Sequence, residues 1–272
     1  MSFRPFFFLL LVGACTGPSR DGVDVSNLSP EQKIIVEKGI SKGYCYTQTD
    51  EQKRYQSAET TYDDHGNVSQ MVFLLPAGDT LSIECHRYDA QNRLIETLEG
   101  NSLRSLETTL KVEFDDAKHL ETETSYKVRK GKVARSIYQN DSSGRNLNKV
   151  YFVDDSLIAT YKYIWDANGN MVRTEGYAST GELQVRLENR YLDQNCTHTL
   201  VFKDEELIKA DSNAYDDQGL VIFTQTTVPG KYSDQIELEY EEGLLVRSTS
   251  QFENLQSTPV VTSKKRDEWE YR

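Results

Sequence analysis

The sequence predicts an all-β fold: an antiparallel meander of about eight ~25-residue hairpin repeats, curled into a sheet or open barrel, with one short N-terminal helix. Three observations predict it. An aromatic residue followed by an acidic turn recurs eight times along the 272 residues, at intervals of 26, 26, 24, 27, 26, 24 and 25 residues. A second set of turn-forming segments lies halfway between these turns. The segments between turns alternate apolar and polar residues, as half-buried strands do.

The first fourteen residues have the pattern of a secretory signal peptide. Arg4 precedes an apolar run over residues 6–12, which is too short to span a bilayer. The small residues Gly13 and Ala14 then lead to Cys15, and this ending resembles the lipobox of bacterial lipoproteins. The resemblance implies that Cys15 becomes the lipid-modified N-terminus and that Thr16 directs the protein to the outer membrane. It leaves open whether the body faces the periplasm or the exterior.

Residues 15–28 are polar and rich in Gly, Ser and Asp, so we expect a flexible, lipid-anchored tether. Residues 29–272 then form a single repeat domain that begins with a helix over residues 30–38. Ser29 is the expected N-cap, Pro30 takes the first helical position, Gln32 completes a capping box and Gly39 ends the helix. We expect this helix to cover one edge or end of the sheet, because an open edge invites aggregation. Residues 43–49 are expected to add a first strand outside the repeats.

Each repeat contains an anchor aromatic residue that ends one strand. The eight anchors are Tyr62, Tyr88, Phe114, Tyr138, Trp165, Tyr191, Tyr215 and Tyr240. In the three clearest copies an aspartate follows the anchor and a glycine stands four residues after it: Asp63 and Gly66, Asp166 and Gly169, Asp216 and Gly219. Weaker copies have Asn92, Lys118 and Asn195 in the glycine position, while Gly144 and Gly243 close two copies of altered spacing.

Glycine and asparagine accept a left-handed backbone at the least cost, and one left-handed residue commonly closes a type I turn between antiparallel strands. The turn aspartate can accept a hydrogen bond from the amide two residues on. Lys118 fits this scheme least, so a different turn is expected there. The second set of turns, such as Pro76-Ala77-Gly78-Asp79 and Asp154-Asp155-Ser156, completes each hairpin and predicts about sixteen repeat strands.

The strands have one apolar and one polar face. Leu110, Val112 and Phe114 share a face, and Lys111 and Glu113 lie on the other. The anchors fall on the apolar face, where we expect them to form an aromatic ladder in the core. This reading is preferred to a role in carbohydrate stacking.

The Tyr-Asp-x-x-Gly-x-apolar unit resembles the YD repeats of the RHS type, over roughly residues 55–250. The resemblance implies a long antiparallel sheet that wraps around on itself. Large members of that family form a hollow shell around a toxic C-terminal domain, and some have been linked to carbohydrate binding. This chain has too few repeats for such a shell and ends soon after the last repeat, at Trp269-Glu270-Tyr271-Arg272. The toxin-shell function is therefore not carried over, and the closer likeness is a short bacterial lipoprotein with degenerate repeats.

Charge and cysteine content narrow the choice of partners. The chain has 43 acidic and 31 basic side chains and a formal net charge of −12, which disfavours nucleic acid and direct binding to an anionic membrane. If Cys15 is lipidated, Cys45, Cys85 and Cys196 remain, an odd number for an oxidising compartment. Cys85 alternates with Leu81 and is read as a core side chain; a Cys45–Cys85 disulfide is left open.

No catalytic or metal-binding pattern is found in the sequence. The four histidines, His65, His86, His119 and His198, are dispersed and do not form a zinc motif. Asp166 to Asn170 resembles the start of a calcium loop, but the position of the closing glutamate is Tyr177, so turn chemistry is the better explanation. We therefore expect no enzymatic activity, no cofactor and no metal.

Two functions remain. The first is a lipid-anchored, non-enzymatic binding or scaffold module for an outer-membrane or surface partner, most simply a protein of the envelope. Glycan binding would need aromatic residues outside the core, for which Tyr126, Tyr151 and Tyr177 are the candidates. The alternative is a carrier that holds lipid or another apolar ligand in the lumen of a curled sheet or barrel.

Overall fold

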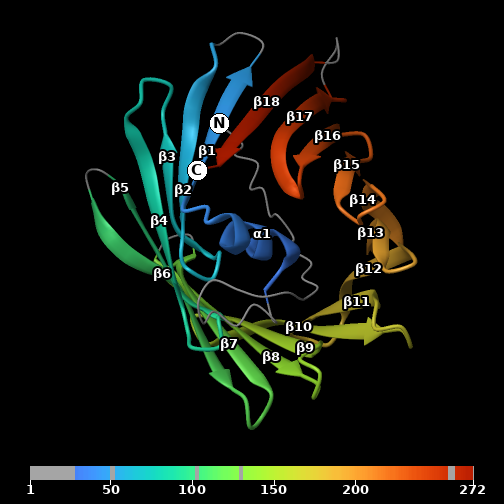
Figure 1. Ribbon diagram of the computed structural model, residues 1–272. Helices are drawn as coiled ribbons and strands as arrows, with labels where there is room; N and C mark the ends of the chain where they lie inside the picture. Colours follow the sequence, from blue (N-terminus) through green and yellow to red (C-terminus); the bar gives the residue numbers. More distant parts are fainter. Residues whose placement is uncertain (1–27, 50–52, 102–103, 129–130, 257–260, 272) are drawn as a thin grey trace.

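A computed structural model describes residues 28–49, 53–101, 104–128, 131–256 and 261–271; the predicted signal peptide, Cys15 and nearly all of the tether lie outside these residues. The described residues form one antiparallel β-barrel of 18 strands and one short helix (Figure 1), which confirms the predicted fold class. The elements are α1 (Pro30–Lys38), β1 (Lys42–Thr49), β2 (Tyr55–Tyr62), β3 (Val68–Leu74), β4 (Thr80–Tyr88), β5 (Leu94–Asn101), β6 (Arg104–Asp115), β7 (Leu120–Val128), β8 (Lys132–Asn140), β9 (Asn146–Val153), β10 (Ser156–Trp165), β11 (Met171–Ala178), β12 (Leu183–Leu192), β13 (Asn195–Lys203), β14 (Glu206–Tyr215), β15 (Val221–Val228), β16 (Tyr232–Glu241), β17 (Leu244–Asn254) and β18 (Val261–Tyr271).

The meander closes into a complete ring. Each strand pairs with its neighbours in sequence, and β1 also pairs antiparallel with β18. Strands β2 to β17 are the sixteen strands of the eight predicted hairpins, and β1 is the predicted extra strand. Strand β18 was not predicted, and it supplies the partner that β1 needs for closure. Closure satisfies the backbone groups that an open sheet would leave at its two edges.

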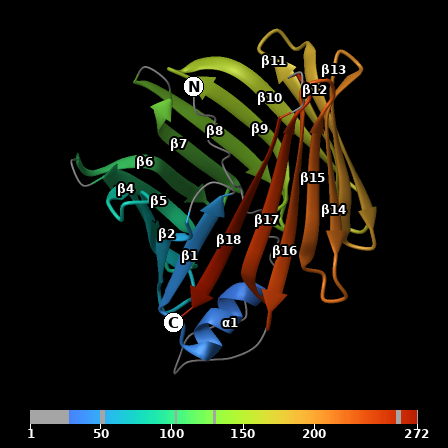
Figure 2. The ribbon, with the colours of Figure 1, turned by 90° about the horizontal axis from the view of Figure 1, so that it is seen from above.

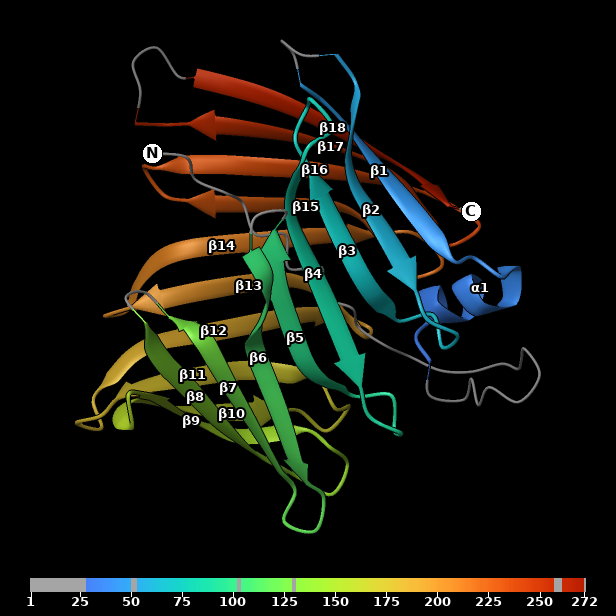
Figure 3. The same ribbon diagram turned by 90° about the vertical axis from the view of Figure 1, so that its left-hand side faces the viewer.

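The two ends of the barrel differ. The turns that follow the anchors gather at one end, where α1 lies (Figures 2 and 3). We call this the capped end, and we call the opposite end, formed by the second set of turns, the mouth. Helix α1 has the predicted bounds: Ser29 and Gln32 form the capping box, and Gly39 ends the helix in a left-handed conformation. The Nε2 of Gln32 donates to Oδ1 of Asn67 at 2.6 Å, which ties the helix to the β2–β3 turn.

A small apolar cluster fixes the helix to the barrel. Ile35, Ile40 and Leu244 are buried together, with Tyr62 and Tyr271 packed against them. Lys38 forms an ion pair with Glu242 in the β16–β17 turn. The helix therefore joins two turns that flank the place where β1 meets β18, and it covers the closure from the capped end.

Strand register decides which side chains face inward. The buried strand residues Val112, Ala134, Ser136, Thr174 and Asp267 all fall on one face when the pairings are followed around the ring. That face is the interior, and it contains the predicted apolar series of Leu110, Val112 and Phe114. Cys85 falls on the opposite face with Leu81, which is 37% exposed, so its prediction as a core residue is wrong.

Anchor side chains are linked differently from the predicted aromatic ladder. Tyr88, Trp165, Tyr191 and Tyr215 each donate a side-chain hydrogen bond to a backbone carbonyl near the start of the preceding odd-numbered strand, over 2.8–3.0 Å. Tyr271 makes the same bond to Leu245 and so acts as a further anchor. Within the described residues the anchors do not stack on one another, and in these four copies a bond from side chain to backbone ties the anchor to the preceding strand instead.

Left-handed turn residues lie where glycine was expected in most copies. Gly66, Gly144, Gly169, Gly219 and Gly243 have φ between 74° and 83°, and Asn92 has φ 64°. The prediction that Asn195 takes the left-handed position is wrong. The left-handed residue of that turn is Asp193, and Asn195 opens β13 opposite Leu192. In the turn after Phe114 the left-handed residue is His119, so this turn differs from the others, as expected from Lys118.

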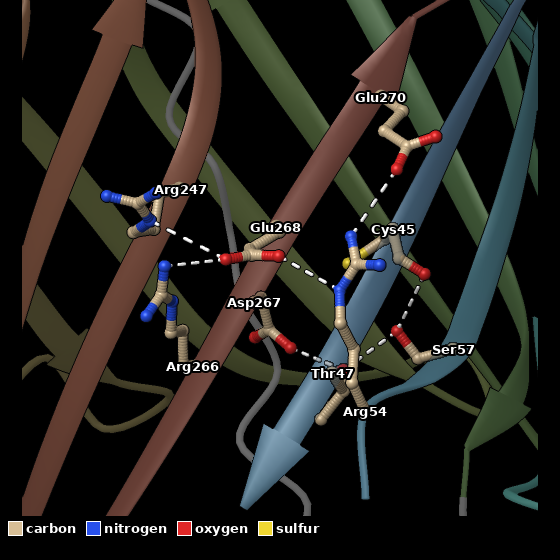
Figure 4. A network of polar contacts seen from close by, with 9 residues as sticks. All are labelled: Cys45, Thr47, Arg54, Ser57, Arg247, Arg266, Asp267, Glu268 and Glu270. Atoms are coloured by element: carbon tan, nitrogen blue, oxygen red, sulfur yellow. Dashed lines mark hydrogen bonds and ion pairs between the residues drawn. The ribbon is translucent and has the colours of Figure 1, made fainter.

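Polar contacts hold the closure between β18, β1 and β2 (Figure 4). Inside the barrel, Thr47 donates to Asp267 and also contacts Ser57 at 2.8 Å. On the outer face, Arg54 reaches Glu268 at 2.9 Å and Glu270 at 3.4 Å. Arg247 and Arg266 also contact Glu268, at 3.7 and 2.6 Å. Closure thus has a polar contact network on each face of the sheet.

Candidate functional site in the barrel lumen

The interior of the barrel is polar and only partly filled. Inward-facing residues of the long strands, such as Glu121, Lys149, Tyr161, Asp211 and Asn213, are half-buried and not buried. Fully packed apolar residues among those described lie mainly beside α1. Barrels of sixteen to eighteen strands are wide enough to leave an aqueous interior. The lumen is therefore a solvent-accessible, chemically varied surface.

Tyrosines surround a lysine on the wall formed by β8 to β10. The Nζ of Lys149 lies 4.8 Å from the ring centre of Tyr138, 5.8 Å from that of Tyr161 and 6.0 Å from that of Tyr151. The Tyr138 hydroxyl donates to Oε2 of Glu123 at 2.9 Å. Burial lowers the pKa of Lys149 despite the nearby Glu123. The aromatic faces stabilise the ammonium by cation–π attraction.

Glu121 continues this polar wall on β7. Burial, and then the charge of Glu123, raises the pKa of Glu121. The wall therefore combines tyrosine rings, an ammonium and two carboxyl groups within a few strands.

A glycine shapes the surface beside Lys149. A Cβ atom at Gly176 would lie 2.9 Å from Cε1 of Tyr161 and 2.7 Å from Cγ1 of Val185. The backbone conformation of Gly176 is not left-handed, so glycine is needed there because it has no side chain and not because of its backbone freedom. The Tyr161 ring packs directly on the backbone of β11, which places an aromatic surface along the wall of the lumen.

The wall from β12 to β15 presents hydroxyl, amide and paired charged groups. Thr199 donates to Asn189 at 2.8 Å, and Lys209 bonds Asp211 at 2.7 Å. Thr226 also donates to Asp211, at 2.5 Å. These groups can exchange hydrogen bonds with a polar ligand, but an acyl chain would desolvate them without replacement.

The predicted glycan candidates are divided between the two faces. Tyr151 lies in the lumen wall next to Lys149. Tyr177 is on the outer face, where its hydroxyl donates to Glu175 at 2.6 Å, and Tyr126 is exposed. The structure therefore brings Tyr151 together with Tyr138 and Tyr161, but it does not bring the three candidates together.

Turn aspartates have structural partners. Asp63, Asp166 and Asp216 each accept from the amides two and four residues later, at 2.8–2.9 Å. The amide of Asn170, the largest contributor, holds the pKa of Asp166 below its usual value. Within the described ranges, no group of three His, Cys, Asp or Glu side chains is arranged to hold a metal ion.

The three described cysteines, Cys45, Cys85 and Cys196, are free. Cys45 faces the lumen, and burial raises its pKa to about 11. No helix in the described part of the chain is long and apolar enough to cross a membrane.

Sequence reasoning missed Lys149, Glu121, Glu123 and Gly176 as site residues. Counting back in steps of two from Tyr138 and Trp165 assigns the inner face of β8 and β10, but it gives no position for β7, β9 or β11. Only the register of the pairings carries that assignment from strand to strand.

No protein-family model and no curated protein matches the sequence. Among solved structures, the chain is similar to a porin-like protein from Bacteroides uniformis, with 10% identity and a TM-score of 0.46, over 86% of this chain and 96% of that one. It is also similar to the Tc holotoxin pore of Photorhabdus luminescens (9% identity, TM-score 0.28, over 81% of this chain and 19% of that one). A third similarity is to TcdB2-TccC3 without its hypervariable C-terminal region (13% identity, TM-score 0.24, over 72% and 14%). The chain thus spans less than a fifth of either toxin chain.

Proposed function

We propose that the protein is a non-enzymatic binding module, anchored to the outer membrane through lipid on Cys15, that takes a polar ligand into its barrel lumen. The observation that carries the proposal is the closed barrel, whose inner wall is half-exposed and lined with tyrosines, hydroxyls and charged groups around Lys149. A ligand that both stacks on aromatic rings and exchanges many hydrogen bonds fits this wall best, and a glycan is the class with those properties.

Charges on the outer face support a body that stands in water. Arg87 on β4 pairs with Glu96 on β5, and Arg186 pairs with Glu188 on β12. These two ion pairs lie far apart around the ring. Barrels that span a membrane turn an apolar band outward. Attachment through a lipidated N-terminus agrees better with these ion pairs than insertion of the strands does.

Orientation follows from where the described chain begins. Leu28 is buried against Val36 of α1, at the capped end of the barrel. A tether ending at Leu28 would hold the capped end toward the membrane and leave the mouth directed away from it. We expect Cys15→Ala to release the protein from membranes into the soluble fraction, measured by fractionation of cells that produce the full chain. Unchanged membrane attachment would refute the anchor.

Ligand binding can be measured with the two tryptophans of the chain, Trp165 and Trp269, because both lie on inward positions of their strands. We expect saturable fluorescence changes on titration of residues 28–272 with soluble neutral oligosaccharides. Tyr161→Ala should weaken binding at least tenfold by removing the stacking surface, and Gly176→Val should do the same by displacing the ring. Tyr177→Ala, a tyrosine on the outer face of the adjacent strand, is the matched control and should leave binding unchanged.

Four outcomes count against this proposal. If none of the oligosaccharides gives saturable binding, or if Tyr161→Ala and Tyr177→Ala lose the same amount, the lumen is not a glycan site. Saturable uptake of a fatty acid in the same assay would favour the alternative function, a carrier for apolar ligands. Turnover of any glycan or ester by the pure protein would show that it is an enzyme.

A further inference from the structure

Exposed aliphatic residues recur at the mouth with the period of the repeat. One stands at or near the start of each even-numbered strand from β4 to β14: Leu81, Leu106, Val133, Leu157, Leu183 and Leu207. Their spacings are 25, 27, 24, 26 and 24 residues. Each is 37–43% exposed. An apolar residue placed in water by six successive copies of a repeat is not a packing accident, because any one copy could have lost it at no cost to the core.

Three of these residues lie opposite aromatic residues on the outer face. Leu157 pairs with Phe152, Leu183 with Tyr177, and Leu207 with Phe202. The three aromatic residues are themselves 25 residues apart. The outside of the mouth therefore has a belt of repeated aliphatic and aromatic pairs over β9 to β14.

Two clefts interrupt this belt, and they are built from equivalent residues two repeats apart. One has a volume of about 300 Å³ and is lined by Val133, Arg135, Asp154 and Asp155 with Thr124. The other has a volume of about 100 Å³ and contains Leu183, Arg186, Asp204 and Glu205 among its lining residues. The corresponding positions are separated by 50 or 51 residues throughout.

An arginine is held in the same way in both clefts. The Arg135 guanidinium lies 5.2 Å from the ring of Phe152, and that of Arg186 lies 4.7 Å from the ring of Phe202. Each arginine also reaches the second acidic residue of the adjoining turn, Asp155 at 3.3 Å or Glu205 at 3.0 Å.

The acidic turns are strained in both copies. Asp154 and Asp155 have φ of 48° and 61°, and Asp204 and Glu205 have φ of 51° and 63°. A two-residue turn of this kind favours Asn-Gly, because a left-handed backbone costs other residues free energy. The chain has instead placed two carboxyl groups at the turn tip, and the second is largely exposed: 88% for Asp155 and 71% for Glu205. Strain retained at a solvent-facing position indicates a binding role.

We propose that this mouth belt docks a partner protein through apolar side chains flanked by lysine or arginine. Charge complementarity selects that occupant: each cleft is lined by two acidic turn residues against one arginine, which leaves an excess of negative charge beside an apolar residue of the belt. A lipid surface does not fit, because the acidic tips extend past the belt and would be desolvated first. A second copy of this chain does not fit either, because docking mouth to mouth would bring the acidic turns of the two copies together. The proposal goes beyond ligand binding in the lumen and uses separate residues.

The test places a photo-crosslinking amino acid in the full-length, membrane-anchored chain in cells that produce it naturally. Positions 157 and 207 probe the mouth belt. Positions 147 and 222 are matched controls, because Leu147 and Ile222 are equally exposed, at 38% and 39%, but lie at the capped end. We expect both mouth positions to crosslink the same protein, and the attached peptide to contain an apolar residue beside a lysine or arginine. The control positions should not crosslink that protein.

A turn variant separates binding from folding. D154N/D155G with D204N/E205G puts the preferred turn residues in both copies, so thermal stability should rise while crosslinking at positions 157 and 207 falls at least tenfold. Unchanged crosslinking in this variant would overturn the role of the acidic tips. The proposal of a partner protein would be overturned by crosslinking only to lipid, only to another copy of the chain, or equally at the control positions. The absence of any crosslink would overturn it as well. Tyr161→Ala should leave the crosslink intact, which distinguishes this proposal from that for the lumen.

Discussion

Gly66 combines two demands, a left-handed backbone and a close approach to the backbone of α1. Its φ of 74° is left-handed, and a Cβ atom there would lie 2.7 Å from the backbone oxygen of Gln32 in α1. Gly144 has a similar φ of 80°, but a Cβ atom there would have open space around it. The two positions therefore separate the cost of backbone conformation from the cost of displacing the helix.

We expect Gly144→Ala to lower the free energy of unfolding by about 1 kcal/mol, the usual cost of a left-handed alanine. Gly66→Ala should cost clearly more, because the added methyl group meets backbone atoms that cannot rotate away. Urea unfolding of both variants measures the difference. Equal losses would mean that the helix does not rest on this turn.

Two turns show where the residue spacing does not predict the left-handed position. Counting four residues from Tyr191 leads to Asn195, but its hairpin loop is shorter and Asp193 takes the left-handed position. Counting from Phe114 leads to Lys118, one residue before His119. The spacing predicts the turn residue only where loop length stays constant, since one residue more or fewer moves the left-handed position.

At the scale of elements, helix α1 is the best predicted part of the chain. Its start and end depend on local bonds, from Ser29 and Gln32 at one terminus and Gly39 at the other, so the sequence contains everything needed. What the helix covers depends on residues far away in sequence, Leu244 and Tyr271 among them. That contact arises only after the barrel closes.

Ile35 should therefore report on the attachment of the helix. It is 2% exposed, so Ile35→Val should cost about 0.5–1.5 kcal/mol and Ile35→Ala about 2–5 kcal/mol. Hydrogen exchange should show faster opening of α1 and of the nearby ends of β1 and β18. If exchange in β1 and β18 stays at the wild-type rate in Ile35→Ala, the helix does not support the closure.

At the scale of the whole molecule, the defining feature is the pairing of β1 with β18. Gln48 and Arg266 are directly opposed on the outer face of these strands. Opposed residues in antiparallel strands lie within the range that a disulfide can bridge. Cysteines at both positions, in a chain whose native cysteines are serine, should form a disulfide on mild oxidation, detected by mass spectrometry.

Gln48→Cys with Lys264→Cys is the matched control, because position 264 is two residues out of register. It should crosslink far more slowly. A barrel that is open in solution would give similar, low yields for both pairs.

The sequence by itself determined the strand count of the repeats, the helix with its caps, and most turn residues, because hydrogen bonds and backbone preferences within a few residues set all of them. Tertiary structure decided closure through β18, the orientation of Cys85, the joining of Lys149 with three tyrosines, and the doubled clefts at the mouth. Those features depend on strand register, which is fixed by pairings between distant segments, and a shift of one residue would send every side chain of a strand to the other face.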